Sequence, residues 1–196
     1  DGENSANVLI GFTITNGGNS TSQGDGGGIY KYGNDINISY TTISGNTANS
    51  SGGGFFAIGD VQMDHVEITD NSANNGGGLF LQSAPSTLNH ITVANNTANN
   101  SGGGLRVCCG EPVNIENSIF YNNSPQEISY SSNDGSPNII NVLYSNVSGG
   151  QDSVEFGESS DSLYWGPGNI DVDPFFADTA NGDYSLLTGS QCIDAG

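Results

Sequence analysis

A glycine triplet recurs four times within the first 104 residues, and this repeat constrains the fold more than any other feature of the chain. The triplets begin at residues 26, 52, 76 and 102, so successive copies are 26, 24 and 26 residues apart. A nearly fixed period in this range is typical of solenoid proteins, in which each repeat packs only against its neighbours. The sequence therefore predicts a stack of similar coils of about 25 residues.

A second and independent repeat consists of two apolar residues that lie five positions apart. Six such pairs follow one another along the chain: Leu9/Ile14, Ile38/Ile43, Met63/Ile68, Leu88/Val93, Ile115/Phe120 and Val142/Val147. A coil with so few apolar side chains cannot bury a face alone, but coils stacked at the strand spacing of about 4.8 Å share one continuous core. A hydrophobic fraction of 34% suits such a thin core, whereas a compact α/β domain needs more.

The residue types of the repeat favour strands over helices. Helical repeats are the competing interpretation of such a period, but the units are rich in Gly, Asn, Ser and Thr, which are unfavourable in helix interiors. The β-branched runs at residues 8–15 and 35–44 are typical of strands. We therefore expect an all-β protein, a right-handed parallel β-helix of about six coils.

We expect residues 1–196 to form a single module, in keeping with the usual size of a domain. Residues 1–148 carry the repeat coils, residues 149–168 are expected to form a long loop, and residues 169–196 an irregular C-terminal cap. The length of the loop suggests a functional role. The cap is expected to fold over the last coil and to hide its strand edge.

Equivalent residues of successive coils are expected to lie above one another in columns. Asparagines that follow the apolar pairs predict a ladder of stacked side-chain amides: Asn46, Asn71, Asn96 and Asn123. The glycine triplets predict coil corners with positive φ or close backbone approach, and not phosphate-binding loops. Strand alternation after each triplet places four apolar residues inside the coil: Ile29, Phe55, Leu79 and Leu105.

The residues next to these inward positions predict a mainly aromatic column on the outer surface, made of Tyr30, Phe56, Phe80 and Arg106. Flat rings in a row can stack on the apolar faces of successive sugars, and the Arg106 guanidinium can bind hydroxyl groups. Tyr164 and Trp165 place two more rings in the long loop, where they predict ligand contact. The alternatives are that the loop or another domain covers the column, and that the loop aromatics attach the loop to the coils.

The charge balance restricts the partners of the chain. Only two Lys and Arg residues accompany 21 Asp and Glu residues, which gives a formal net charge of −19. Such a charge repels nucleic acids and anionic membrane surfaces, and it disfavours polyuronates unless calcium bridges the carboxylates. A neutral glycan is not repelled. The charge suits a secreted, extracellular protein, although three cysteines do not settle the compartment.

Two histidines occupy equivalent positions in neighbouring coils. The column that contains them consists of Tyr40, His65, His90, Asn117 and Tyr144. Beside Asp64, the two imidazoles could hold a metal ion, but no third clear ligand follows from the sequence. A ladder of turn residues is the favoured interpretation.

The acidic residues and cysteines give weaker predictions. Asp152, Glu155 and Asp161 are candidate ligands of a structural calcium ion, against the alternative of a solvated acidic surface. Cys108 and Cys109 are adjacent, and a disulfide between them would be strained, so we expect free, partly buried thiols.

Several segments resemble those of bacterial secreted proteins with parallel β-helix repeats. The similarity lies in residues 11–17, 43–48 and 170–196 and extends over nearly the whole chain. The resemblance implies the β-helix fold, but that family includes polysaccharide lyases, hydrolases, adhesins and non-catalytic modules. Small β-helices similar to this one occur as carbohydrate-binding modules beside plant-wall hydrolases such as xylanases, which suggests that the chain is part of a larger protein.

Together, the resemblance and the charge favour a non-catalytic module that binds a neutral plant-wall polysaccharide, preferably xylan, and directs an attached catalytic domain to it. No cofactor is required. The first alternative is a lyase or glycosidase. The resemblance implies that a lyase needs a Lys or Arg base, yet Lys31 is expected to point inward and leaves only Arg106, whereas a pair of carboxylates could still serve a glycosidase. The second alternative is an adhesin or structural spacer without affinity for sugars.

Overall fold

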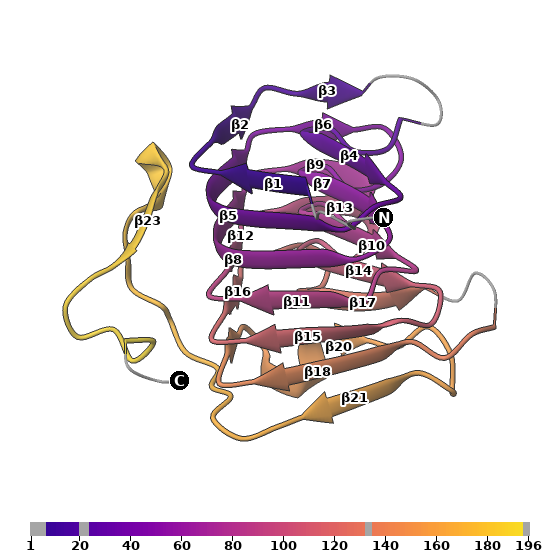
Figure 1. Cartoon of the computed structure of the whole chain (residues 1–196). Coiled ribbons are helices and arrows are strands. Elements are labelled where there is room, and N and C mark those ends of the chain that lie inside the picture. Colours follow the sequence, from indigo (N-terminus) through magenta and orange to yellow (C-terminus); the bar gives the residue numbers. More distant parts are fainter. Residues whose placement is uncertain (1–6, 20–23, 132–134, 194–196) are drawn as a thin grey trace, which may run out of the picture.

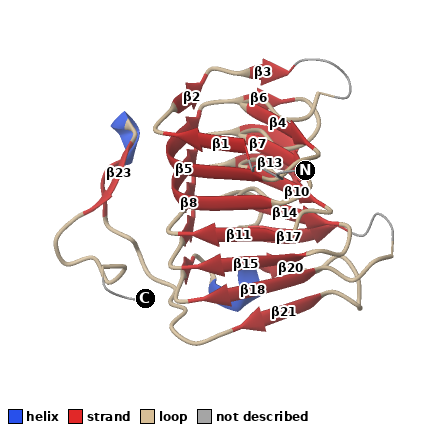
Figure 2. Ribbon diagram, viewed as in Figure 1, coloured by secondary structure: helices blue, strands red, loops and turns tan. Residues whose placement is uncertain are grey.

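The computed structural model is an all-β protein whose parallel sheets stack as a solenoid of about six turns (Figures 1 and 2). It describes residues 7–19, 24–131 and 135–193. Within these residues, the helical structure is limited to two short 3₁₀ segments, η1 (Gly150–Ser153) and η2 (Thr179–Asn181). None of the described helices is long and apolar enough to cross a membrane. The predicted fold class is confirmed.

The largest sheet forms one side of the stack and contains 11 strands. Its strands are β1 (Asn7–Ile10), β2 (Thr13–Thr15), β5 (Ile36–Ser44), β8 (Val61–Thr69), β11 (Ser86–Asn89), β12 (Thr92–Ala94), β15 (Pro112–Glu116), β16 (Ile119–Tyr121), β18 (Ile139–Leu143), β19 (Asn146–Val147) and β21 (Ser162–Trp165). In β5 and β8 a single strand continues through a bend that separates two strands in other coils. This bend carries the column of residues on which the site depends.

Two further parallel sheets complete the coils. One contains β4 (Ile29–Tyr32), β7 (Phe55–Ile58), β10 (Leu79–Gln82), β14 (Leu105–Cys108), β17 (Ile128–Ser131) and β20 (Val154–Glu155). The other contains β3 (Gly18–Asn19), β6 (Thr47–Ala48), β9 (Ser72–Asn75) and β13 (Thr97–Ser101). Outside the stack, β22 (Phe176–Asp178) and β23 (Asp183–Leu186) form an antiparallel pair.

The apolar repeats superpose as predicted and form the core. Strand pairing aligns the first members of the pairs in the order Leu9, Ile38, Met63, Leu88, Ile115 and Val142. The second members align in the order Ile14, Ile43, Ile68, Val93, Phe120 and Val147. Beyond the first coil these side chains are at most 1% exposed, and each contributes roughly 1.5–3 kcal/mol through burial.

The asparagine ladder is also confirmed, and it satisfies backbone groups inside the turns. Asn71 shows the pattern: its Oδ1 accepts hydrogen bonds from the backbone N–H and the Nδ2 of Asn46, and its Nδ2 donates to Ile43 O and to Asn96 Oδ1. The ladder ends at Glu127, whose carboxylate accepts hydrogen bonds from the backbone N–H and the Nδ2 of Asn123. All four asparagines are buried.

The glycine triplets serve as the predicted corners. The first glycine of each triplet has a positive φ, between 59° and 69°. The second lies against the backbone of the next coil. At Gly53, for example, a Cβ atom would overlap with the carbonyl oxygens of Ser72 and Gly77. A side chain there would force the two coils apart and break the hydrogen bonds between them, so the position requires glycine.

The prediction of a long loop at residues 149–168 is wrong, because this segment forms another coil. Val154 pairs with Ile128 in β17, and Trp165 pairs with Val142 in β18, so both extend core columns. The segment lacks the glycine triplet, but the alternation of Leu163 and Trp165 is a strand pattern that could have revealed it. Trp165 is partly buried against the core.

The described part of the C-terminal segment, residues 169–193, does not cover the last coil as we expected. Asn146 forms a bridge with Ile170, so the chain follows the stack as far as that residue. The antiparallel pair β22 and β23 then lies beside the flank of the stack, close to coils in its middle (Figure 1). Tyr184 holds it there: the Tyr184 hydroxyl donates to Asp70 Oδ2 at 2.9 Å and accepts from Asn95 Nδ2 at 2.7 Å.

The expectation for the cysteines is wrong for one pair. Cys108 and Cys109 form a disulfide, and Cys192 is the one free cysteine. Cys109 has a φ of 74° and is the coil equivalent of Ser83, Gly59 and Gly33, which also have positive φ. The disulfide therefore lies at a recurrent tight corner, a backbone feature that the adjacency of the two residues in the sequence does not reveal.

Candidate functional site

The bend of the large sheet carries a column of exposed or partly exposed side chains. Its five members share a left-handed backbone with φ between 47° and 54°: Tyr40, His65, His90, Asn117 and Tyr144. Non-glycine residues seldom adopt this region, so its recurrence in five coils reflects a turn that the whole stack requires. This outcome agrees with the predicted ladder of turn residues, which we call the bend column.

Neighbouring rings of the bend column stack on one another. The ring centroids of Tyr40 and His65 are 4.9 Å apart, and those of His65 and His90 are 4.7 Å apart. The free ends of the column differ. Gly11 precedes Tyr40 in the register and leaves one face of the Tyr40 ring uncovered, whereas Gly168 lies directly against the Tyr144 ring. Tyr40 and Tyr144 are 64% and 42% exposed.

A groove of about 550 Å³ lies between the bend column and the C-terminal segment. The column side contributes His65, His90, Asn117 and Tyr144, and the C-terminal side contributes Leu186 and Cys192. We call this cavity the flank groove. Its volume is within the range of small-molecule sites, and its lining combines apolar side chains with amide, imidazole and phenol groups. Burial raises the pKa of the Cys192 thiol, so this thiol is protonated at neutral pH.

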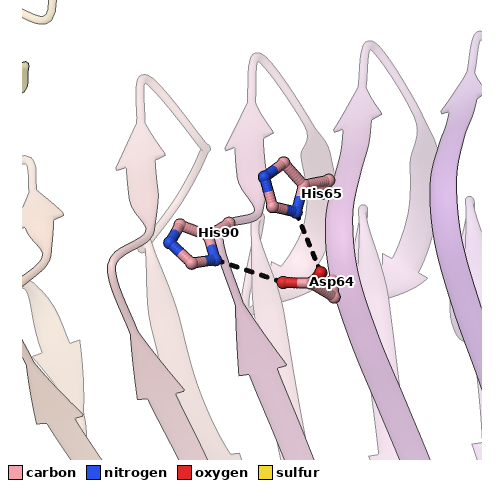
Figure 3. A group of neighbouring side chains, drawn as sticks. All are labelled: Asp64, His65 and His90. Carbon is pink, nitrogen blue, oxygen red and sulfur yellow. Dashed lines mark hydrogen bonds and ion pairs between the residues drawn. The ribbon is translucent and has the colours of Figure 1, made fainter.

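Asp64 connects the two histidines of the groove. Its Oδ2 lies 2.9 Å from His65 Nδ1, and its Oδ1 lies 3.1 Å from His90 Nδ1 (Figure 3). Asn89 Nδ2 lies 3.0 Å from Asp64 Oδ1 and 2.8 Å from His90 Nδ1. Partial burial alone would raise the pKa of Asp64. The hydrogen bonds from His65, His90 and Asn89 outweigh this effect and hold the pKa below its ordinary value.

The wall of the flank groove depends on the Tyr184 anchor, which gives a first prediction. In Tyr184→Phe, Asp70 and Asn95 lose their common partner, and a lost hydrogen bond of this kind costs about 1 kcal/mol. We expect amide hydrogen exchange of residues 176–186 to become roughly fivefold faster, with an unchanged thermal midpoint of the coils. The exposed Tyr164 allows the control Tyr164→Phe. Equal exchange in both variants would contradict the role of Tyr184.

The predicted aromatic column exists, but its exposure was predicted wrongly. Tyr30, Phe56, Phe80 and Arg106 align in register, and the Phe56 ring stacks on those of Tyr30 and Phe80 at centroid distances of 5.3 and 5.4 Å. However, Phe56 is only 4% exposed and Phe80 only 5%. The rings cover one another's faces, and Ile58 and Cys108 pack against them. Neither Phe56 nor Phe80 offers a platform for a sugar.

The remaining predicted sugar contacts do not form one site. Tyr30 is exposed on β4 at the start of the described coils, whereas Tyr164 is exposed on β21 in the last coil. Trp165 faces the core. Arg106 donates from Nη2 to Ser131 Oγ, and partial burial lowers its pKa while the charge of Glu155 opposes this effect. Only Tyr30 and Tyr164 retain exposed rings, at opposite ends of the stack.

The candidate calcium ligands do not cluster either. Both carboxylate oxygens of Asp161 already accept backbone hydrogen bonds, Oδ1 from Asn138 N and Oδ2 from Gly157 N and Glu158 N. Asp161 therefore fixes a turn. Among the described residues, Asp152, Glu155 and Asp161 form no group of ligand atoms close enough for an ion, and such a group occurs only at Asp64, His65 and His90.

The sequence identified the residues of one wall of the flank groove, although as a ladder of turn residues and not as a binding surface. Tyr40 and Tyr144 belong to the same recurrent position as the two histidines, and this position follows the inward repeat by two residues in each coil. The opposite wall was not predictable in this way, because Leu186 and Cys192 lie in the non-repetitive segment. Their location depends on contacts with residues about a hundred positions earlier, such as that between Tyr184 and Asp70.

The fold and the groove define the protein as a parallel β-solenoid with a solvent-open groove along one flank. Known proteins do not narrow this description: no family model, curated protein or solved structure matches the chain.

Proposed function

We propose that this protein is a non-catalytic module that binds a neutral polysaccharide in the flank groove. The observation that carries the proposal is the alignment of the groove with the bend column, which extends across successive coils. Coils are spaced by about 4.8 Å, a distance close to the length of one sugar residue in an extended chain. The bend column can therefore present one side chain to each successive sugar.

The chemistry of the lining supports a sugar ligand. Sugars offer apolar ring faces and many hydroxyl groups, so they are bound by aromatic rings together with amide and imidazole groups. Tyr144 supplies the ring, and Asn117, His65 and His90 supply the polar groups. A net charge of −19 disfavours an anionic polymer but does not oppose a neutral one.

The state of the two cationic side chains supports a binding role over a lyase. Lys31 is 7% exposed, and its Nζ donates hydrogen bonds to the backbone oxygens of Ile58 and Asp60. Arg106 belongs to a different sheet from the flank groove. Neither is placed to act as a base there. A glycosidase pair of carboxylates is the remaining catalytic alternative, and the assay below detects it.

The finer parts of the proposal rest on charge and on the resemblance described above. We propose xylan as the preferred polysaccharide, an extracellular location, and an attached catalytic domain that the module directs to plant cell walls. A requirement for calcium is not part of the proposal.

Affinity electrophoresis tests the proposal with soluble xylan, mixed-linkage glucan, mannan and pectin. We expect xylan or another neutral glycan to retard the protein without releasing reducing ends. Retardation with release of reducing ends would instead indicate a glycosidase. Absence of retardation by all four polymers would favour the adhesin or spacer.

Substitution of Tyr144 locates the binding surface. Loss of a stacked ring costs roughly 1–1.5 kcal/mol, so Tyr144→Ala is expected to weaken glycan affinity about five- to tenfold. Tyr32 is a matched control because it is 75% exposed and lies on the opposite sheet in β4. Tyr32→Ala is expected to bind normally. Full binding by Tyr144→Ala, or an equal loss in both variants, would exclude the flank groove as the site.

A further inference from the structure

Both histidines of the chain lie at the same place in the structure. The sequence contains two histidines, and the fold brings them together with Asp64 at the edge of the flank groove (Figure 3). One ligand atom from each of the three residues lies within 4.8 Å of the other two. The side chains of all three are between 46% and 48% exposed, so an ion from solution can reach them.

The fold holds this arrangement in advance. His65 and His90 are positioned by the same left-handed bend in adjacent coils, and their rings stack with centroids 4.7 Å apart. Asp64 lies in β8, immediately before His65, so that its carboxylate faces Nδ1 of both rings. Three donors that are already convergent lose little conformational freedom when they bind an ion. Ligand atoms around a tetrahedral ion are about 3.4 Å apart, so small rotations of exposed side chains suffice.

Asp64 Oδ1 and His90 Nδ1 already face each other closely. The two atoms lie 3.1 Å apart, and Asn89 Nδ2 lies 2.8 Å from the same ring nitrogen. A cation that binds both atoms takes the place of the contact between them. Neutral imidazole is the form that binds metals.

The donor set selects the kind of metal. Two imidazole nitrogens and one carboxylate suit Zn²⁺ and neighbouring transition metals, whereas Ca²⁺ and Mg²⁺ prefer sites made of oxygen. Three protein ligands leave at least one coordination position for water or a ligand in the flank groove. The strongly negative charge of the chain adds a favourable long-range attraction for a cation.

We propose that Asp64, His65 and His90 form a binding site for a divalent transition-metal ion, with Zn²⁺ as the expected occupant. The site shares His65 and His90 with the proposed sugar-binding groove, but its test contains no sugar, so failure of one proposal does not affect the other. It also gives the paired histidines a role beyond the turn itself, which Asn117 and Tyr144 adopt without any imidazole.

Calorimetric titration of metal-free protein without an added histidine tag tests the site, with ZnCl₂ as the probe. We expect one equivalent of Zn²⁺ to bind. His65→Gln or His90→Gln should weaken binding at least tenfold, and the double variant should abolish it, since loss of even an outer-shell partner of a metal site costs 10–100-fold. Binding to wild type no tighter than to the double variant would overturn the proposal.

Two control variants separate this site from its surroundings. Glu116 belongs to the same column as Asp64, two coils further on, where the next residue is Asn117 and not histidine. Glu116→Gln therefore removes one equivalent charge without removing a ligand. Cys192→Ser removes the thiol of the flank groove. Both variants should bind Zn²⁺ within about twofold of wild type. A tenfold loss in either would contradict the assignment.

A second measurement uses wild-type protein alone and so does not depend on the folding of variants. Diethyl pyrocarbonate modifies accessible imidazoles, and both histidines are exposed. One equivalent of Zn²⁺ should protect both from modification, as read by mass spectrometry of the peptides, whereas the same concentration of Ca²⁺ should not. Undiminished modification at saturating Zn²⁺ would overturn the proposal.

Discussion

Asn71→Ala is expected to lower the free energy of unfolding by about 3–5 kcal/mol, because it interrupts the buried amide ladder at its centre. The side chain is 1% exposed and makes four hydrogen bonds. Alanine cannot replace them, and water cannot reach the groups that remain. The Asn46 backbone N–H and the Ile43 carbonyl each lose the amide partner, and an unsatisfied buried group costs about 1–3 kcal/mol. Asn96 Oδ1 keeps its hydrogen bond from the backbone N–H of residue 71. Urea unfolding followed by circular dichroism measures the change.

Asn74→Ala is the matched control for this prediction. Asn74 lies three residues further along the same coil and is more exposed, and it also hydrogen bonds to its neighbours, Asn49 O and Asn99 Nδ2. Water can replace these hydrogen bonds, so Asn74→Ala should lower the free energy of unfolding by less than about 1 kcal/mol. If the two variants were equally stable, burial of the ladder would not be the source of its contribution.

The sequence predicted the repeated part of the fold correctly because the spacing of equivalent residues gives the register in which the strands pair. Each coil places apolar residues at the positions of Ile38 and Ile43, and the four middle coils add an amide at the position of Asn46, so superposition follows from counting. The same reasoning failed at residues 149–168. That coil keeps the inward positions of Val154 and Trp165 but has lost the glycine and asparagine markers.

The candidate site was harder to predict, because exposure depends on neighbours and not on strand alternation. Alternation assigns Phe56 and Phe80 to the outer face of their sheet, and this assignment is correct. It does not reveal that rings stacked in adjacent coils cover one another, or that Ile58 and Cys108 close their edges. In the bend column, by contrast, Tyr40 stacks on His65 and is still 64% exposed.

Local packing also explains why the C-terminal segment escaped prediction. Its position depends on single side chains such as Tyr184 and Phe176, whose partners lie in coils far back along the chain. Nothing periodic connects these partners. The flank groove therefore combines a wall that the repeat determines with a wall that only tertiary contacts determine.

Glu127→Gln is expected to stabilise the protein above neutral pH and to remove a pH dependence. Glu127 terminates the asparagine ladder and is 5% exposed. Burial raises its pKa from 4.5 to about 7, although hydrogen bonds from Asn123 oppose the shift. The folded state thus holds this proton more tightly than the unfolded state. The corresponding stability is complete below pH 4.5 and is lost as the pH rises to about 7.

The difference between the unfolded-state pKa of 4.5 and the folded-state pKa of about 7 corresponds to roughly 3 kcal/mol in the free energy of unfolding. Glutamine keeps an oxygen that accepts from Asn123 but carries no charge to desolvate, so the variant should gain up to that amount at pH 8 and little at pH 4.5. Urea unfolding of both proteins at the two pH values measures the change, with the exposed Glu111→Gln as the control. A stability difference between Glu127→Gln and wild type that is the same at both pH values would mean that the carboxyl group is ionised in the ladder throughout, held by Asn123 in spite of its burial.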